Sequence, residues 1–172
     1  MRPIRPRRRA RPVKGYRRLL VPLTDNAESR AALDVACRLA AERGATVVTV
    51  SVIELPPALP LDAHLASEEA QARALLERAE ATAASFGVHT VQRSVRARDA
   101  GSAIVDEAKA AGVELIVLGA ARKTLRSTGA LVFGDAVRHV LTAAPCRVLV
   151  VAARPELEPS AAKRATAAEL AA

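Results

Sequence analysis

The sequence predicts an α/β fold: a three-layer sandwich around a five-stranded, mainly parallel sheet of Rossmann-like type, in the strand order 3-2-1-4-5. Apolar, strand-like runs alternate with helix-like segments, which is typical of parallel sheets with right-handed crossovers. Of the 172 residues, 51% are hydrophobic but only 2% are aromatic. The core must therefore consist of Val, Leu, Ile and Ala, which suits a buried parallel sheet beneath Ala-rich helices.

Five short apolar runs are expected to form the strands. The second is rich in β-branched residues, which favour strands. The third is more polar and is expected at an edge of the sheet, whereas the fourth is apolar throughout, as in a strand buried on both faces. In chain order, the expected strands are residues 18–23, 45–53, 88–95, 113–118 and 147–152.

Four helices are expected between these strands. Asp25 or Asn26 caps the first, whose apolar residues recur at spacings of three and four. A glycine is expected to end each of the first three helices, and prolines between residues 56 and 60 exclude regular structure before the second. The first helix is expected between this cap and Gly44, and the other helices at residues 65–85, 102–111 and 133–142, with Gly87 and Gly112 after the second and third.

Basic side chains are concentrated at the start of the chain. Nine of the 26 Lys and Arg residues lie in residues 1–18, without an acid among them, leaving 17 to balance 18 Asp and Glu. We therefore expect a disordered basic arm (1–17), one folded domain (18–153) and a tail (154–172). The arm would attract a membrane surface or a transporter. Specific nucleic-acid binding is not expected, because no aromatic residues are interleaved.

Several classes of protein lack support in the sequence. Cys37 and Cys146 form no CxxC pair, which predicts inert buried thiols in a reducing cytosol. The three histidines lack metal-ligand spacing, and no order of side chains predicts catalysis. No stretch approaches the ~20 apolar residues that span a bilayer. The Arg-rich start lacks the apolar region of a secretory signal, so export is not expected. A cytoplasmic protein is expected, at the inner face of the membrane if the arm binds lipid.

The strand order predicts a ligand site where it reverses, at the carboxyl ends of the first and fourth strands. Leu23, Thr24 and Asp25 arrive there from the first strand, and Gly119 arrives from the fourth. A basic loop follows Gly119, and Gly134 opens the last helix. A strand, a glycine-containing loop and a helix N-terminus together hold phosphate in α/β proteins.

These motifs resemble the universal stress protein family from about residue 16 to residue 153. The resemblance rests on VPLT in the first strand, ELIVLGA in the fourth and FGDAVRHVLTAAPCRVLVV at the end. It implies an adenine nucleotide alpha hydrolase-like sheet and a stress- or signal-responsive function. The segments CRLAAERGA, LPLDA and APCRVLV are similar to cytosolic domains behind amino-acid permeases, which implies regulation of a transporter.

The family's nucleotide motif is Gly-x2-Gly-x9-Gly-(Ser/Thr), and this chain matches it in part. Gly119 matches the first glycine and Gly134 the third, but Arg122 stands in place of the second. Eleven residues instead of nine precede Gly134, and Asp135 replaces the Ser/Thr. Asp135 is expected to cap the helix, to repel a phosphate and even to occupy the anion site itself.

The base-binding residues also differ from the family pattern. In nucleotide-binding relatives an acid at the end of the first strand contacts adenine, whereas Thr24 stands there and Asp25 follows it. Val52 matches the residue of the second strand that touches the base. The resemblance therefore implies a non-catalytic domain with a degenerate site, in which ATP binds weakly or not at all and AMP remains a candidate.

Two alternatives stay open at this point. Arg122, Lys123 and Arg126 either replace backbone amides as phosphate ligands or are solvated cations on an exposed loop, and the second is the more common case for a run of charges. The other interpretation of the function is a universal stress protein that binds ATP and hydrolyses it weakly.

The fifth strand predicts a homodimer. It is last in the sheet, and its apolar residues leave an unpaired edge, which associates unless it is charged or covered. Pairing of two identical strands about a two-fold axis closes such a contact, and dimers of related universal stress proteins resemble this arrangement. The residues expected at the dimer edge are Val148, Leu149, Val150 and Val151.

Overall fold

The computed structural model describes residues 15–60, 62–121, 123–124 and 131–152. Most of the predicted basic arm, residue 153 with the predicted tail (154–172), and Arg122 and Arg126 of the predicted loop lie outside these residues. The described elements are β1 (Arg18–Leu23), α1 (Ala27–Ala41), β2 (Thr46–Glu54), α2 (Ala66–Ser85), β3 (Thr90–Ala97), α3 (Ala100–Ala111), β4 (Leu115–Gly119), β5 (Lys123–Thr124), β6 (Leu131–Val132), α4 (Asp135–Ala143) and β7 (Arg147–Val151).

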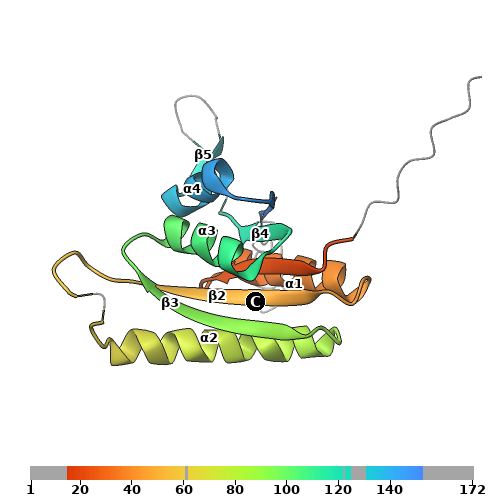
Figure 1. The fold of residues 1–172 in the computed structure, drawn as a ribbon, viewed down its shortest axis with the longest axis horizontal. Helices are drawn as coiled ribbons and strands as arrows, with labels where there is room; N and C mark the ends of the chain where they lie inside the picture. The colour runs from red at the N-terminus through yellow and green to blue at the C-terminus, as the bar shows by residue number, and fades with distance from the viewer. Residues whose placement is uncertain (1–14, 61, 122, 125–130, 153–172) are drawn as a thin grey trace, which may run out of the picture.

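The main sheet has five strands in the order β3-β2-β1-β4-β7, and every neighbouring pair is parallel. This confirms the predicted order 3-2-1-4-5 and the edge position of the third strand. A separate pair, β5 and β6, forms a short antiparallel hairpin with Lys123 opposite Val132 (Figure 1). The hairpin was not predicted, because strands of two residues are too short to show a hydrophobic period.

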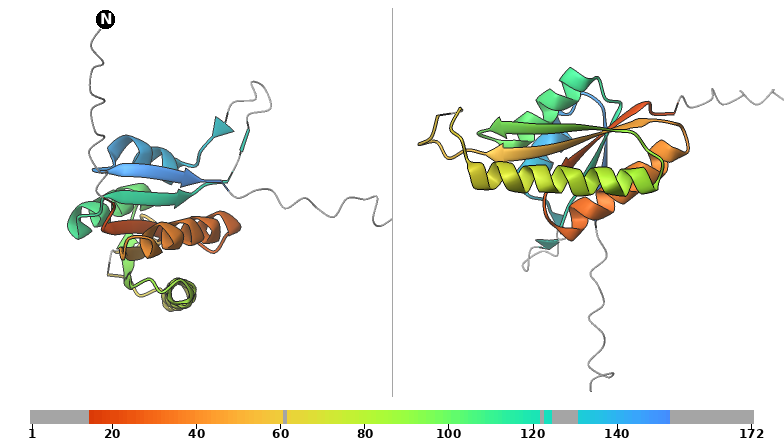
Figure 2. Two further views of the ribbon diagram at one scale, coloured as in Figure 1. Left: turned by 90° about the vertical axis from the view of Figure 1, so that its right-hand side faces the viewer. Right: turned by 90° about the horizontal axis from the view of Figure 1, so that it is seen from below.

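Helices cover both faces of the sheet, α1 and α2 one face and α3 and α4 the other (Figures 1 and 2). Side chains alternate in direction along each strand, so a strand contributes residues to the cores on both faces of the sheet. Leu19 and Val21 of β1 enter the core beneath α1 and α2, and Leu20 enters the core beneath α3 and α4. Tyr16 packs against the first of these cores, so the packed part of the chain includes a residue of the predicted arm.

The predicted helix ends are confirmed at three glycines with a positive φ, a conformation that glycine adopts at little steric cost. The φ angles are 63° at Gly44, 67° at Gly87 and 59° at Gly112. Four starting points differ from the prediction by two residues, those of β3, α3, β4 and α4. β3 begins two residues late because the Val88 N–H still bonds to the carbonyl of Ala83 in α2, and α3 begins at Ala100, two residues early, because Asp99 caps it.

Candidate functional site

A pocket of about 170 Å³ lies where β1 and β4 end, at the reversal of the strand order. Leu20 is opposite Ile116 in the parallel register, so Leu23 and Gly119, three residues further along, end at the same level. The structure therefore brings together four of the predicted site residues. These are Leu23, Thr24, Val52 and Gly119, and they are joined by Ala100 and Ile104 of α3 and by Ala136 and Val137 of α4.

Gly119 has a packing role as well as a place in the pocket. A Cβ atom there would lie 2.4 Å from the carbonyl carbon and oxygen of Glu28. Real Cβ atoms do not approach backbone that closely, so only glycine lets the first turn of α1 rest on the end of β4. The glycine that matches the nucleotide motif is thus required by the fold itself.

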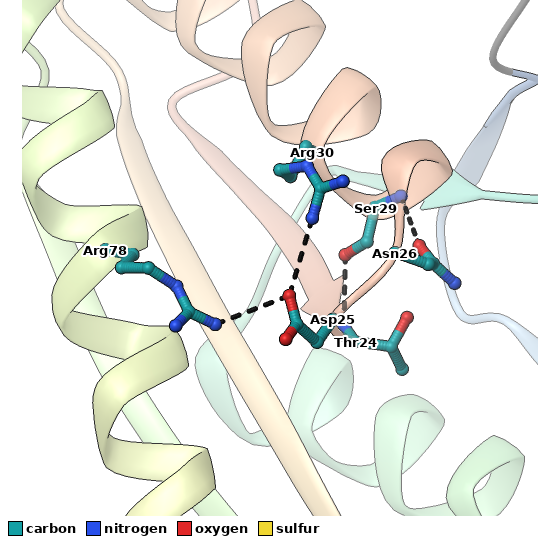
Figure 3. Close-up of polar contacts among 6 residues, drawn as sticks. All are labelled: Thr24, Asp25, Asn26, Ser29, Arg30 and Arg78. Atoms are coloured by element: carbon teal, nitrogen blue, oxygen red, sulfur yellow. Dashed lines mark hydrogen bonds and ion pairs between the residues drawn. The ribbon is translucent and has the colours of Figure 1, made fainter.

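Ser29 shapes the turn between β1 and α1, although the sequence did not single it out as a site residue. Its hydroxyl is buried, accepts a hydrogen bond from the Thr24 N–H at 3.0 Å and donates to the carbonyl of Pro22 at 3.4 Å. The Ser29 N–H in turn donates to the Oδ1 atom of the N-cap residue Asn26 at 2.7 Å (Figure 3). The spacing of three residues between Asn26 and Ser29, typical of a helix cap, was the available signal.

Asp25, also predicted as a nucleotide-binding residue, is not among the described residues that line this pocket. Its Oδ1 atom lies 3.4 Å from both the Arg30 guanidinium of α1 and the Arg78 guanidinium of α2 (Figure 3). The Asp25 carboxylate points away from the pocket because it is attracted to these two cations, which lie on the side of the sheet that α1 and α2 cover. Asp25 therefore contributes no carboxylate to the pocket.

Glu54, at the end of β2, is the single acid among the described residues that line the pocket. Its Oε1 atom accepts the Ala100 N–H at 3.0 Å, so the carboxylate is engaged by the start of α3. The Arg98 guanidinium, close to Ala100 in sequence, donates to the carbonyls of Leu55, Pro56 and Leu59 and holds the segment after β2 in place. Sequence reasoning missed both residues, because each acts on a segment about forty or more positions away.

The N-terminus of α4 differs from the prediction at Asp135. The N-cap residue is Gly134, and no side chain of the described residues caps the helix. Asp135 is the first helical residue, and a side chain caps a helix from the position before it. The Asp135 carboxylate is 92% exposed and lies 3.5 Å from Arg138. It does not cap the helix, so within the described part of the chain no side chain competes with an anion for the first N–H groups of α4.

Asp99, Ser102 and His139 are the residue types of a catalytic triad, but they do not have its geometry. The Ser102 hydroxyl donates to Asp99 at 2.6 Å and lies 3.5 Å from Nε2 of His139. Hydrogen bonds from the Ser102 hydroxyl and N–H lower the pKa of the Asp99 carboxyl. In a catalytic triad the histidine stands between the serine and the acid and takes the hydroxyl proton. Here the serine stands between the other two, so this arrangement does not activate a nucleophile.

Other kinds of site are not evident in the described residues. No group of three or more His, Cys, Asp or Glu side chains in this part of the chain could hold a metal ion. Within the same part, every helix is too short or too polar to cross a membrane.

The comparison with protein families identifies the chain. The model of the universal stress protein family matches residues 15–152, almost the whole described part. The chain belongs to the universal stress protein family. No curated protein sequence matches this universal stress protein.

Solved structures of other universal stress proteins share the fold. A family member from Burkholderia pseudomallei is 27% identical, with a TM-score of 0.64 over 83% of this chain and 100% of that one. One from Archaeoglobus fulgidus in complex with dAMP is 18% identical, with a TM-score of 0.62 over 80% and 98% of the two chains. One from Arabidopsis thaliana with AMP bound is 15% identical, with a TM-score of 0.58 over 83% and 96%.

Proposed function

We propose that this universal stress protein is a non-catalytic, nucleotide-responsive domain that binds AMP in preference to ATP, and ATP weakly or not at all. The observation that carries this proposal is the pocket at the ends of β1 and β4. It combines apolar walls and an uncapped helix N-terminus with the lack of a free carboxylate among its described lining residues. The dAMP and AMP bound by two of the similar proteins support a monophosphate as the ligand.

The base end of the pocket favours weak binding. Val52 and Leu118 offer apolar surface to a planar ring. Thr24 stands where nucleotide-binding relatives have an acid that contacts adenine, and a threonine hydroxyl is a weaker acceptor for an amino group than a carboxylate. The carboxylate of Asp25 is held by two arginines, and that of Glu54 by the Ala100 N–H.

The phosphate end of the pocket favours one phosphate over three. The free N–H groups at the start of α4 and the helix dipole attract an anion. Asp135 places a negative charge on the same turn, only partly offset by Arg138. Repulsion grows with the charge of the ligand, and each added negative charge about 4 Å from a carboxylate in water costs on the order of 1 kcal/mol.

A thermal-shift series with AMP, ADP, ATP and cAMP tests the proposal. Ligand at 100 times its dissociation constant stabilises a protein by about 2.7 kcal/mol, and we expect AMP to act at the lowest concentration. Thr24→Asp restores an acid at the base end and should strengthen AMP binding, whereas Ser94→Asp adds the same charge on the distant strand β3 and should not. A larger shift with ATP than with AMP, or no gain from Thr24→Asp, contradicts the proposal.

We also propose a homodimer through β7. The strand forms an edge of the sheet, and Leu149 on it is 37% exposed although apolar. Leu141 of α4, the next element toward the N-terminus, is 44% exposed. These are the two large hydrophobic side chains that stand out as exposed among the described residues. Two-fold pairing of β7 with its copy would cover Leu149.

A further inference from the structure

We propose a second ligand site in this protein, for a free amphipathic anion, in the groove between α1 and α2. The groove has a volume of about 350 Å³. It lies on the face of the sheet that α1 and α2 cover, whereas the nucleotide pocket reaches α3 and α4 on the other face. The two sites share only the turn at the end of β1 and the Ser29 beside it, so they can be tested separately.

The floor of the groove is apolar and open because α2 turns small side chains toward the sheet. Three of the four buried residues of α2 are alanines, and one of them, Ala79, lines the groove. Leu23 and Leu33 form the rest of the buried floor, at 5% and 4% exposure. Leu75 and the exposed Ala81 lie along α2 as a wall. This lining suits a hydrocarbon chain or ring.

Two guanidinium groups meet at the mouth of the groove, one from each helix (Figure 3). Arg30 and Arg78 each lie 3.4 Å from the same oxygen of Asp25. Charge-assisted hydrogen bonds to a carboxylate are ordinarily about 2.7–2.9 Å long, so the two cations share one acid at long distance. The mouth carries two positive charges against one negative charge and favours a further anion.

The arginines keep hydrogen-bond donors for such an anion. A guanidinium has five N–H donors, and in the described part of the chain the contact with Asp25 uses one nitrogen of each arginine. Of the hydroxyl side chains that line the groove, Ser29 bonds to the β1–α1 turn and Thr82 donates to the carbonyl of Arg78 at 3.0 Å, whereas Thr24 adds one neutral hydroxyl. Recognition of the negative charge of a head group therefore falls to Arg30 and Arg78.

A neighbouring groove of about 390 Å³ has the opposite charge, although it shares five lining residues with this one: Leu23, Thr24, Asp25, Leu75 and Arg78. Glu54 and Glu68 also line it, so it presents three acids against one arginine. An anion is therefore directed to the groove between α1 and α2. An apolar floor below a cationic mouth fits a molecule with one hydrocarbon part and one carboxylate or phosphate head.

Isothermal titration calorimetry with octyl phosphate, below its micelle concentration, tests the site. The wild-type protein should bind it, and Arg78→Gln should weaken binding about tenfold, the loss of one charge-assisted hydrogen bond. Asp25→Asn should tighten binding, because it removes the competing acid. Arg73→Gln, an exposed arginine of α2 outside the groove, makes the same change in net charge and should leave binding unchanged.

Further variants and probes decide between the possible occupants. Ala81→Phe narrows the groove at an exposed position without changing charge and should also weaken binding. Inorganic phosphate should bind poorly because it has no hydrocarbon part. Octyltrimethylammonium should bind poorly because its head group is a cation. AMP binding should be the same in Arg78→Gln as in the wild type, so a failure at this site is distinguishable from a failure at the nucleotide pocket.

Four results would overturn the proposal. They are the absence of binding of octyl phosphate to the wild type, equal losses in Arg78→Gln and Arg73→Gln, equal affinity for the cationic amphiphile, and weaker binding in Asp25→Asn. Binding that requires phosphatidylglycerol vesicles and is lost in Arg78→Gln would assign the two arginines to a membrane surface instead of a free ligand. Circular dichroism of each variant establishes that it is folded.

Discussion

Gly119 at the end of β4 lies directly against the backbone of Glu28 in the first turn of α1. A Cβ atom at residue 119 would stand 2.4 Å from the Glu28 carbonyl group, and backbone atoms cannot move aside as the end of a flexible side chain can. At Gly134, the other glycine that matches the nucleotide motif, a Cβ atom would meet nothing within 4 Å. Packing therefore requires a glycine at residue 119, whereas the space around residue 134 would admit a side chain.

Gly119→Ala is expected to destabilise the protein by about 2 kcal/mol or more, because α1 must move away from the sheet. Gly134→Ala should cost less than about 1 kcal/mol, since it changes only the N-cap residue of α4. Urea unfolding of both variants measures the difference. Equal stability of the two variants would show that the contact with Glu28 does not constrain residue 119.

Ser29→Ala is expected to destabilise the protein by about 1–3 kcal/mol, because the Thr24 N–H loses its acceptor at a buried position. Ser67→Ala removes a hydroxyl from the exposed surface of α2 and should change stability by less than about 0.5 kcal/mol. Urea unfolding midpoints of the two variants give the comparison. If Ser29→Ala unfolds at the wild-type midpoint, the hydroxyl does not hold the turn.

A pH dependence of stability is expected from Cys37. Burial, assisted by the nearby Asp34 carboxylate, raises the pKa of this thiol from 9.0 to about 11. A raised pKa in the folded state gives stability that is complete below pH 9 and is lost as the pH rises toward 11. The loss is on the order of 2 kcal/mol.

Urea unfolding at pH 8 and pH 10.5 measures this loss. Cys37→Ala removes the titrating group and should lose less stability over the same interval than the wild type. Cys146→Ala is the matched control, because Cys146 is only partly buried, and a hydrogen bond with the backbone of Ile116 opposes the rise that burial causes in the pKa of its thiol. The account of Cys37 is wrong if Cys37→Ala and the wild type show the same pH dependence.

The fold was predictable because its signals are local and repeated. Four of the five strands of the main sheet are apolar runs, and Gly44, Gly87 and Gly112 mark the helix ends at which φ is positive. Alternation of strands and helices then leaves few topologies for a parallel sheet. The β5–β6 hairpin escaped prediction because it depends on two residue pairs and on no periodic pattern.

The site was predictable only in part, because the direction in which a side chain points depends on residues that are distant in the sequence. The strand order alone is enough to place Thr24 and Gly119 at the pocket. Asp25 follows Thr24 directly, but Arg78 of α2 helps to turn it to the other face, and no local pattern links these two residues. The contact between Glu54 and the Ala100 N–H is likewise invisible in the sequence, since it spans 46 positions.

Leu149→Lys is expected to convert the proposed dimer to a monomer, because it places a charge on the apolar edge of β7. Ser94→Lys adds the same charge on the other edge of the sheet and should leave the oligomeric state unchanged. Light scattering at micromolar concentration measures both. A wild-type monomer, with a mass that Leu149→Lys does not alter, counts against dimerisation through β7.

Calorimetric titration of the wild-type protein with ATP tests the central claim most directly. At roughly 100 μM protein a dissociation constant in the low micromolar range would be plain, and we predict no measurable heat with ATP under conditions in which AMP gives a signal. Asp135→Ser, which removes the negative charge beside the α4 N-terminus, should raise any residual affinity for ATP. A low-micromolar dissociation constant for ATP, or a crystal with its triphosphate between Gly119 and Gly134, would contradict the account.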